Sequence, residues 1–325
     1  MAKPKVFAAH SLFEPARKIL VESCELDSWT KHERPPREEL LKRVKDKDGL
    51  ICLLTEKVND ELLQAAPKLR IVANVAVGFD NIDVAACTKR GVVATHTPGV
   101  LDETTADFAW ALMMAVARRL GEGEALGRSG NWKGWDLDQL VGTDVWGKTL
   151  GIVGFGRIGR AMARRASGFE MKVIYTDAVR ASEEVERELR AEFREMNALL
   201  AESDFISVHV PLLPETRRLF DAAKLDRMKR TAFLINTSRG PVVDEAALVA
   251  ALEKGKIAGA ALDVFENEPR IHPGLKRPNV VLTPHLASAS LETRTKMACM
   301  AAENVVTLFQ GRRPANALNP EVLKG

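Results

Sequence analysis

The sequence lacks the features that mark several classes of protein. Its 325 residues contain no uninterrupted apolar run of about 18 residues, the length needed to cross a membrane. Its 47 basic and 44 acidic side chains nearly balance, and no basic block stands out. We therefore expect neither a membrane nor a nucleic-acid partner.

Cysteine is scarce and scattered. Cys24, Cys52, Cys87 and Cys299 form no CxxC pair. Isolated cysteines of this kind are typical of reduced thiols in the cytoplasm, which is the location we expect. The cysteines predict no metal site.

What the sequence does contain is an alternation of short apolar runs and helical stretches. The first series of expected strands is 5–9, 49–53, 70–74 and 92–95, with helices such as 37–44 and 60–66 between them. A second series runs from Thr149 to Pro284, and Leu291 to Phe309 predicts one long helix. Because this alternation is typical of βα units, we expect an α/β fold with two doubly wound parallel sheets.

The segment between the two series is unusual. Asp102 to Leu120 predicts a helix that is almost wholly apolar over 106–117 and must be covered on every side, by a second domain or a second subunit. Gly121 to Gly147 holds seven glycines and three tryptophans, which predicts an irregular connection.

A glycine-rich motif opens the second series. Gly154, Gly156 and Gly159 lie between an apolar strand, 148–153, and a predicted helix. In this context the glycines allow a tight turn, close approach to a pyrophosphate and close helix packing. The next strand ends at Asp177, whose carboxylate suits the ribose hydroxyls of NAD and repels the 2′-phosphate of NADP. Arg180 lies near enough to soften that preference.

Three chemically complementary residues follow predicted strands of the second series. They are Arg239, Glu268 and His285. Strands of a parallel sheet end at one edge, where ligands bind. A guanidinium can hold a carboxylate, and an imidazole paired with a carboxylate can transfer a proton. The residues alone leave Glu266 as a rival to Glu268.

The order of the motifs resembles the D-isomer-specific 2-hydroxyacid dehydrogenase family over nearly the whole chain. The motifs are 77–83 (VGFDNID), 154–159 (GFGRIG), 209–212 (HVPL), 236–240 (NTSRG), 263–265 (DVF) with Glu268-Pro269, and 283–285 (TPH). The resemblance implies that Arg239 binds substrate, that Glu268 rather than Glu266 pairs with the histidine, and that His285 is the acid/base.

The resemblance also implies a domain arrangement and further contacts. A Rossmann NAD-binding domain, residues 100–286, would be inserted into a flavodoxin-like substrate domain, 1–99 and 287–325, with the active cleft between them. Substrate would meet Leu54, Val77 and Gly78 together with Arg239 and His285. The implied cofactor contacts are Thr104, Gly154, Gly156, Arg157, Ile158, Gly159, Asp177, Val210, Pro211, Thr216, Thr237, Ser238, Arg239, Asp263 and His285.

The expected reaction is hydride transfer between NADH, with NADPH also possible, and a small 2-oxo acid. Glyoxylate or hydroxypyruvate is the substrate we expect. The alternatives are 3-phosphoglycerate, 2-ketogluconate, or a non-catalytic NAD-sensing corepressor. The resemblance further implies a homodimer in which Trp135 could reach the neighbouring pocket. Ala287 stands where glyoxylate reductases commonly have glycine.

Overall fold

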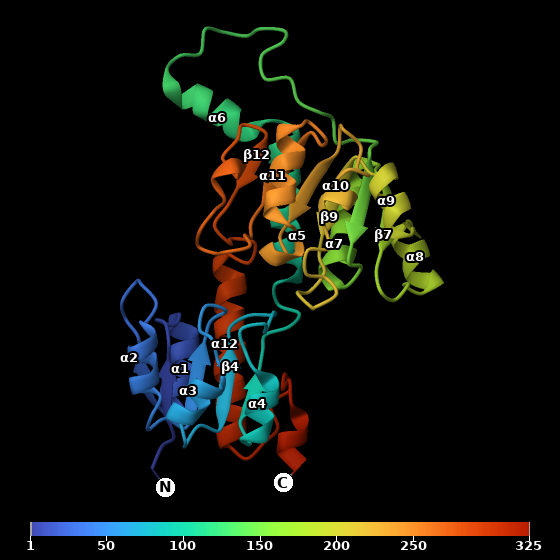
Figure 1. Ribbon diagram of the computed structural model, residues 1–325. Coiled ribbons are helices and arrows are strands. Elements are labelled where there is room, and N and C mark those ends of the chain that lie inside the picture. Colours follow the sequence, from blue (N-terminus) through green and yellow to red (C-terminus); the bar gives the residue numbers. More distant parts are fainter. Residues whose placement is uncertain (1, 325) are drawn as a thin grey trace. The chain divides into compact units, whose positions relative to one another are not determined.

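The protein is described by a computed structural model that covers residues 2–324, and its chain divides into two compact units. The first unit contains Met1–Leu101 and Ala289–Gly325, and the second contains Asp102–Ser288. Each unit is built around one parallel sheet, as the sequence predicts (Figure 1). No helix among the described residues is both long and apolar enough to cross a bilayer.

The first unit has a five-stranded sheet in the order β2-β1-β3-β4-β5, which is the flavodoxin-like order. The strands are β1 (Lys5–Ala8), β2 (Glu25–Ser28), β3 (Gly49–Cys52), β4 (Ile71–Asn74) and β5 (Val93–Thr95). The helices are α1 (Glu14–Ser23), α2 (Arg37–Arg43), α3 (Asp60–Ala65), α4 (Val84–Lys89) and α12 (Leu291–Phe309). Apolar clusters cover both faces of the sheet, one formed with α1 and α12 and the other with α2 and α3.

The C-terminal segment joins the first unit through an asparagine. Asn319 is fully buried beside β5, where its Oδ1 accepts from the Ala94 N–H at 2.9 Å. Its Nδ2 donates to the Val92 carbonyl at 2.9 Å and to the Thr88 hydroxyl at 3.0 Å. The side chain thus satisfies backbone groups that an edge strand would otherwise leave unpaired.

The second unit has a seven-stranded sheet in the order β12-β11-β10-β9-β6-β7-β8, which is a Rossmann order with one further strand. The strands are β6 (Thr149–Val153), β7 (Lys172–Thr176), β8 (Ala191–Phe193), β9 (Phe205–Val208), β10 (Phe233–Asn236), β11 (Gly259–Leu262) and β12 (Val280–Leu282). The helices are α5 (Asp102–Ala117), α6 (Leu120–Ser129), α7 (Arg157–Ala166), α8 (Glu183–Leu189), α9 (Met196–Glu202), α10 (Ala222–Leu225) and α11 (Glu245–Glu253).

Short polar side chains fix where many of these helices begin. Each accepts a hydrogen bond from a backbone N–H of the first helical turn, which would otherwise be unsatisfied. These caps are Asn59, Asp83, Ser182, Asp221, Asp244 and Ser290.

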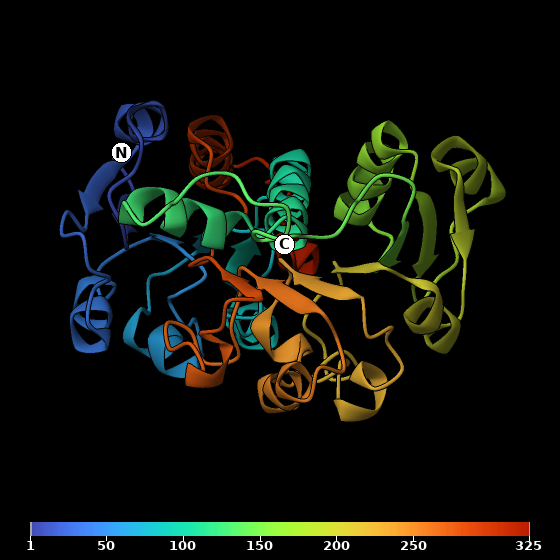
Figure 2. The same cartoon turned by 90° about the horizontal axis from the view of Figure 1, so that it is seen from above.

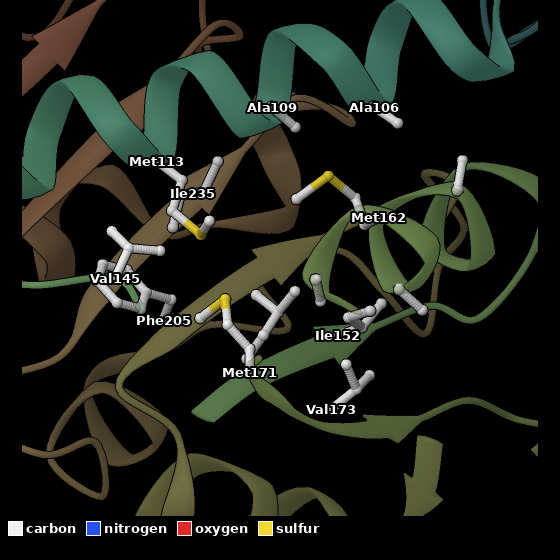
Figure 3. Packing of buried hydrophobic residues seen from close by; sticks show 14 of the residues in the cluster. Ala106, Ala109, Met113, Val145, Ile152, Met162, Met171, Val173, Phe205 and Ile235 are labelled. Carbon is white, nitrogen blue, oxygen red and sulfur yellow. The ribbon is translucent and has the colours of Figure 1, made fainter. Parts of the chain in front are cut away.

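Helices cover both faces of the second sheet (Figure 2). One face packs against α5 and α7, and Figure 3 shows Met162 of α7 pointing toward Ala106 and Ala109 of α5. The small alanines let the two helices approach closely. Met162 is fully buried and fills the space above Ile152 of β6.

The connection after α5 differs from the expectation. Residues 121–147 are not wholly irregular, because α6 forms over Leu120–Ser129. Arg119 adopts a left-handed conformation, with φ of 52°, and separates α6 from α5. The helix has no buried residue, and with the first part of the loop that follows it stands away from the sheet of its unit (Figure 1). The last part of that loop packs back, since the Thr143 N–H donates to the Ala117 carbonyl at 2.8 Å and Val145 is buried. Its glycines obscure it in the sequence because glycine disfavours helix interiors.

We predict that Met162→Ala lowers the free energy of unfolding by about 2–4 kcal/mol, because it opens a cavity between α7 and α5. Met162→Leu nearly preserves the volume and should cost less than about 1.5 kcal/mol. Guanidinium unfolding followed by tryptophan fluorescence measures both values. If Met162→Ala lost less unfolding free energy than Met162→Leu, the close packing of Met162 between α7 and α5 would be contradicted.

Candidate functional site

The glycine turn between β6 and α7 combines close contacts with one open position. Gly154 has a φ of 95°, and a Cβ there would lie 2.7 Å from the His209 carbonyl carbon. A Cβ on Gly159 would lie 2.2 Å from the Gly154 carbonyl oxygen, whereas one on Gly156 would meet nothing within 4 Å. The turn is therefore tight at its two ends and open in the middle.

The same turn leaves the start of α7 available to an anion. Gly156 is the N-cap and makes no side-chain capping bond, and Arg157 begins the helix. Free N–H groups and the helix dipole attract negative charge at such a site. The open space at Gly156 and these N–H groups fit a pyrophosphate, as expected of an NAD site.

Asp177 follows β7 beside this turn. Its Oδ2 accepts from the Phe155 N–H at 2.5 Å, which fixes the carboxylate against the glycine motif. Arg180 does not pair with Asp177. Its guanidinium instead forms two bonds to Glu186, Nε to Oε1 at 2.8 Å and Nη2 to Oε2 at 2.9 Å.

His285 and Glu268 are in direct contact. The imidazole Nδ1 lies 3.0 Å from Glu268 Oε2, and Glu268 Oε1 accepts from the Phe265 N–H at 3.1 Å. Because an ionised carboxylate only accepts, we assign the Nδ1 proton to this bond. Nε2 is then the ring atom that can exchange a proton with a substrate.

Several groups set the charge of Glu268. Burial alone would raise its pKa, but the hydrogen bond and charge of His285, the Phe265 N–H and the charge of Arg239 lower it further than burial raises it. The net pKa lies below the ordinary value for glutamate. Glu268 is therefore ionised at neutral pH and can stabilise a protonated imidazole.

The rival carboxylate has other partners. Glu266 Oε1 lies 3.2 Å from Nη2 of Arg218, and the Glu266 N–H donates to Glu245 Oε1 at 2.5 Å. The spacing of the two glutamates in the sequence does not distinguish them. The structure places Glu268, and not Glu266, against His285.

Arg239 follows β10 in a loop that an asparagine shapes. Asn236 is almost fully buried; its Oδ1 accepts from the N–H and hydroxyl of Ser238, and its Nδ2 donates to the Arg239 carbonyl at 3.1 Å. A Cβ on Gly240 would lie 1.9 Å from the Phe265 carbonyl carbon, so this loop lies directly on the loop after β11. Arg239 is thereby close enough to Glu268 for its positive charge to lower the pKa of that carboxyl.

Asp263 anchors the loop that carries His285. Its buried carboxylate accepts from the Thr283 hydroxyl at 2.6 Å, the Leu286 N–H at 2.7 Å and the Ala287 N–H at 2.8 Å. His285 is held in a left-handed conformation with a φ of 56°. Ala287 is itself buried here, so its methyl group is accommodated in the loop.

The remaining candidate cofactor residues lie in the second unit. The Thr216 hydroxyl donates to the Pro211 carbonyl at 2.6 Å within the loop after β9, which also carries Val210. The buried hydroxyl of Thr237 has no hydrogen-bond partner among residues 2–324. Thr104 lies in the first turn of α5, and Ile158 lies in the first turn of α7.

The candidate substrate residues Leu54, Val77 and Gly78 lie in loops of the first unit. His96 Nδ1 lies 2.8 Å from the Val77 carbonyl, and Asn74 donates to the Gly78 carbonyl at 3.0 Å. Sequence reasoning missed both supporting side chains. Their only sequence signal is that each stands at or just after the end of a predicted strand.

We predict that Asp263→Asn destabilises the protein by about 1–3 kcal/mol, because an amide nitrogen would replace an acceptor and leave a buried N–H unpaired. Thr283→Val removes only one donor from the same carboxylate and should cost about 1 kcal/mol. Chemical denaturation measures both. Equal stability of Asp263→Asn and wild type would disprove the anchoring.

Comparison with known proteins assigns this chain to a family. The family model for "D-isomer specific 2-hydroxyacid dehydrogenase, NAD binding domain" matches residues 110–287. A glyoxylate reductase of Korarchaeum cryptofilum is 53% identical over 325 residues, covering 99% of this chain and 98% of the relative.

Solved structures agree with that assignment. The TT0316 protein of Thermus thermophilus has a TM-score of 0.91 at 42% identity, covering 97% of this chain and 99% of its own. An NADPH-dependent glyoxylate/hydroxypyruvate reductase of Sinorhizobium meliloti, solved with NADP and malonate, has a TM-score of 0.86 at 33% identity, with coverage of 98% and 97%. The predictions of fold class, family and NAD-linked enzyme are confirmed: the chain belongs to the D-isomer-specific 2-hydroxyacid dehydrogenase family.

Proposed function

We propose that this enzyme reduces glyoxylate, and also hydroxypyruvate, to the corresponding 2-hydroxy acid. The family catalyses hydride transfer between a nicotinamide cofactor and small 2-oxo acids. The observation that carries the proposal is the contact between His285 and Glu268 beside Arg239, in the unit that holds the NAD fingerprint. Relatives named glyoxylate reductase match over nearly their whole length, which supports this substrate.

The reduced nicotinamide supplies the hydride when it is bound. In our proposal, His285 Nε2 donates the proton that the carbonyl oxygen of the substrate requires. Glu268 lowers the cost of holding that proton by stabilising the imidazolium. Arg239 binds the substrate carboxylate through its guanidinium fork.

The roles of the first-unit residues also belong to the proposal. The backbone N–H groups of Val77 and Gly78 would donate to the substrate carboxylate, and Leu54 would line the pocket. The bond between His96 and the Val77 carbonyl supports this, because it orients the peptide that carries the Gly78 N–H. Leu54 is 37% exposed, so its side chain is available for contact.

We propose NADH as the preferred cofactor. Asp177, fixed against the Phe155 N–H, retains acceptor capacity for ribose hydroxyls and places a negative charge where NADP carries its 2′-phosphate. NADPH would then bind more weakly. The cytoplasmic location stays a prediction, which the free state of all four cysteines supports.

We predict that His285→Asn lowers kcat for glyoxylate reduction by at least about 100-fold while NADH still binds, since the general acid is lost. Asparagine is the suitable replacement because it tolerates the left-handed backbone of this position. Steady-state kinetics and NADH fluorescence titration measure the two effects. A loss much smaller than this would mean that another group supplies the proton.

For Glu268→Gln, the expected change is in the pH profile. Rising pH removes the proton from the donor, so kcat/KM for reduction falls at high pH. A neutral glutamine no longer favours the protonated imidazole, so this decline should begin at lower pH than in wild type. A pH profile that does not move in this variant would contradict the role of Glu268.

The preferred substrate is identified by comparing kcat/KM for glyoxylate, hydroxypyruvate, 2-ketogluconate and phosphohydroxypyruvate.

We also propose a homodimer. α6 has no buried residue, and the loop after it exposes large apolar side chains: Trp132 by 58%, Trp135 by 83% and Leu137 by 80%. Apolar surface of this extent marks an interaction site. On α5, Phe108, Trp110 and Met114 remain only partly buried, and this residual apolar surface also supports contact with a second copy.

Analytical ultracentrifugation should find about twice the chain mass of 35.7 kDa. The double variant Trp135→Ala, Leu137→Ala should weaken self-association by at least about tenfold, as expected when central apolar contacts are truncated. Val179→Ala is the matched control, since Val179 is 79% exposed in the same unit but lies beyond β7. A monomeric wild type at micromolar concentration would refute the dimer.

A further inference from the structure

Arg180 is the cation nearest in sequence to the predicted ribose-binding carboxylate. It lies three residues after Asp177, and its side chain is 61% exposed. A guanidinium at the end of this strand has the geometry and charge to recognise a phosphate on the adenosine ribose. Its position therefore raises the question of why it would not favour NADPH.

The structure shows that this guanidinium is already engaged. Both of its bonds to Glu186 are short, and the pairing is bidentate, which is the strongest geometry for an arginine and a carboxylate. The guanidinium carbon also lies 5.7 Å from the centre of the Phe193 ring. Glu186, on α8, and Phe193, on β8, thus hold Arg180 from two sides.

Tyr175 links this pair to the cofactor turn. Its hydroxyl donates to Glu186 Oε1 at 2.6 Å and accepts from the Ala181 N–H at 2.9 Å, which closes the 175–181 segment. Its ring stacks on Phe155 of the glycine turn, with centroids 3.9 Å apart. Tyr175 and Asp177 both contact Phe155, the tyrosine through the Phe155 ring and the aspartate through the Phe155 N–H, so the two side chains border the same residue of the turn.

We propose that Glu186 is a specificity-determining residue for NADH over NADPH, because it holds Arg180 in an ion pair and so withholds that cation from a ribose 2′-phosphate. Asp177 repels the phosphate, and Glu186 occupies the cation that could attract it. Asp177 thus disfavours NADPH by repulsion, and Glu186 disfavours it by removing a possible attraction. The inference rests on the proposed NADH preference.

The charge state of Glu186 is suited to this role. Its hydrogen bonds from Arg180 and Tyr175 lower its pKa to about 2. A folded-state pKa below the ordinary value means that the carboxylate is charged at every pH above the acid range. Protonation of Glu186 therefore does not remove its charge from Arg180 at neutral pH.

Direct binding tests the proposal without catalysis. The dissociation constants of NADH, NADPH and 2′,5′-ADP are measured by fluorescence or calorimetry for wild type, Glu186→Gln and Tyr175→Phe. Glu186→Gln should tighten NADPH and 2′,5′-ADP by about tenfold, the effect of one gained charge-assisted contact, and should change NADH less than about twofold. Tyr175→Phe loosens Glu186 without changing charge and should give a smaller gain of the same sign.

Two controls separate release of Arg180 from simple loss of negative charge. Glu184→Gln removes the same charge from an exposed position on the same helix and should leave the NADPH to NADH ratio within about twofold of wild type. The double variant Arg180→Ala, Glu186→Gln should lose the gain.

Two outcomes would overturn the proposal. The first is an unchanged NADPH to NADH ratio in both Glu186→Gln and Tyr175→Phe. The second is a gain that survives removal of Arg180, which would assign the effect to charge alone. Wild-type binding of NADPH as tight as that of NADH would instead refute the preference assigned to Asp177, so the two failures are distinguishable.

Discussion

The parallel register of β10, β11 and β12 is the constraint from which the site follows. Asn236 pairs with Leu262, and Leu262 pairs with Leu282, so the three strands end level with one another. The next residue of each chain segment therefore emerges at the same edge of the sheet. Asp263 and Thr283 are two of these residues, and their side chains meet at 2.6 Å. Arg239, Glu268 and His285 come together because they lie a few residues further along these aligned segments.

Once the strands are aligned, electrostatics decides how the site is arranged. Glu268 is partly buried, and a carboxylate loses hydration there unless charged or polar partners replace it. His285, Arg239 and the Phe265 N–H provide that replacement and lower the pKa of Glu268. The glutamate therefore stays ionised at pH values where an ordinary glutamate would begin to take up a proton. The same contacts fix the imidazole. A site that stabilises its own buried carboxylate thus also orients the group that we propose as the proton donor.

The sequence predicts the fold, but it does not predict which side chains pair with one another. The alternating pattern predicts both sheets, the bounds of α12 match the expected Leu291–Phe309, and β7 ends at Thr176, directly before the expected Asp177. Periodicity identifies such elements because each buries an apolar face. It missed β2, Glu25–Ser28, whose residues are largely polar, and α6, whose glycines and exposed surface give no core pattern.

Pairings across loops were harder still to predict. The choice between Glu266 and Glu268 came from the family resemblance, since two acids two residues apart have equal local chemistry. The pairing of Arg180 with Glu186 depends on how the 175–181 segment closes on Tyr175, which no local propensity encodes. His96, directly after β5, reaches the Val77 carbonyl in the loop after β4. In each case the sequence supplies the residue type, and tertiary structure selects the partner.

Two aspartates at strand ends show how hydrogen-bond saturation separates structural from ligand-binding roles. An ionised carboxylate has about four acceptor sites. Asp263 is fully buried and uses three of them on the loop after β12, which carries His285, so its first role is to hold His285 in place. Asp177 has one close donor, the Phe155 N–H, and the longer contact from Val179 is 3.5 Å. Its remaining capacity can therefore serve a ligand. Residue type and strand-end position are the same for both, and the count of donors, together with the deeper burial of Asp263, distinguishes the anchor from the recognition group.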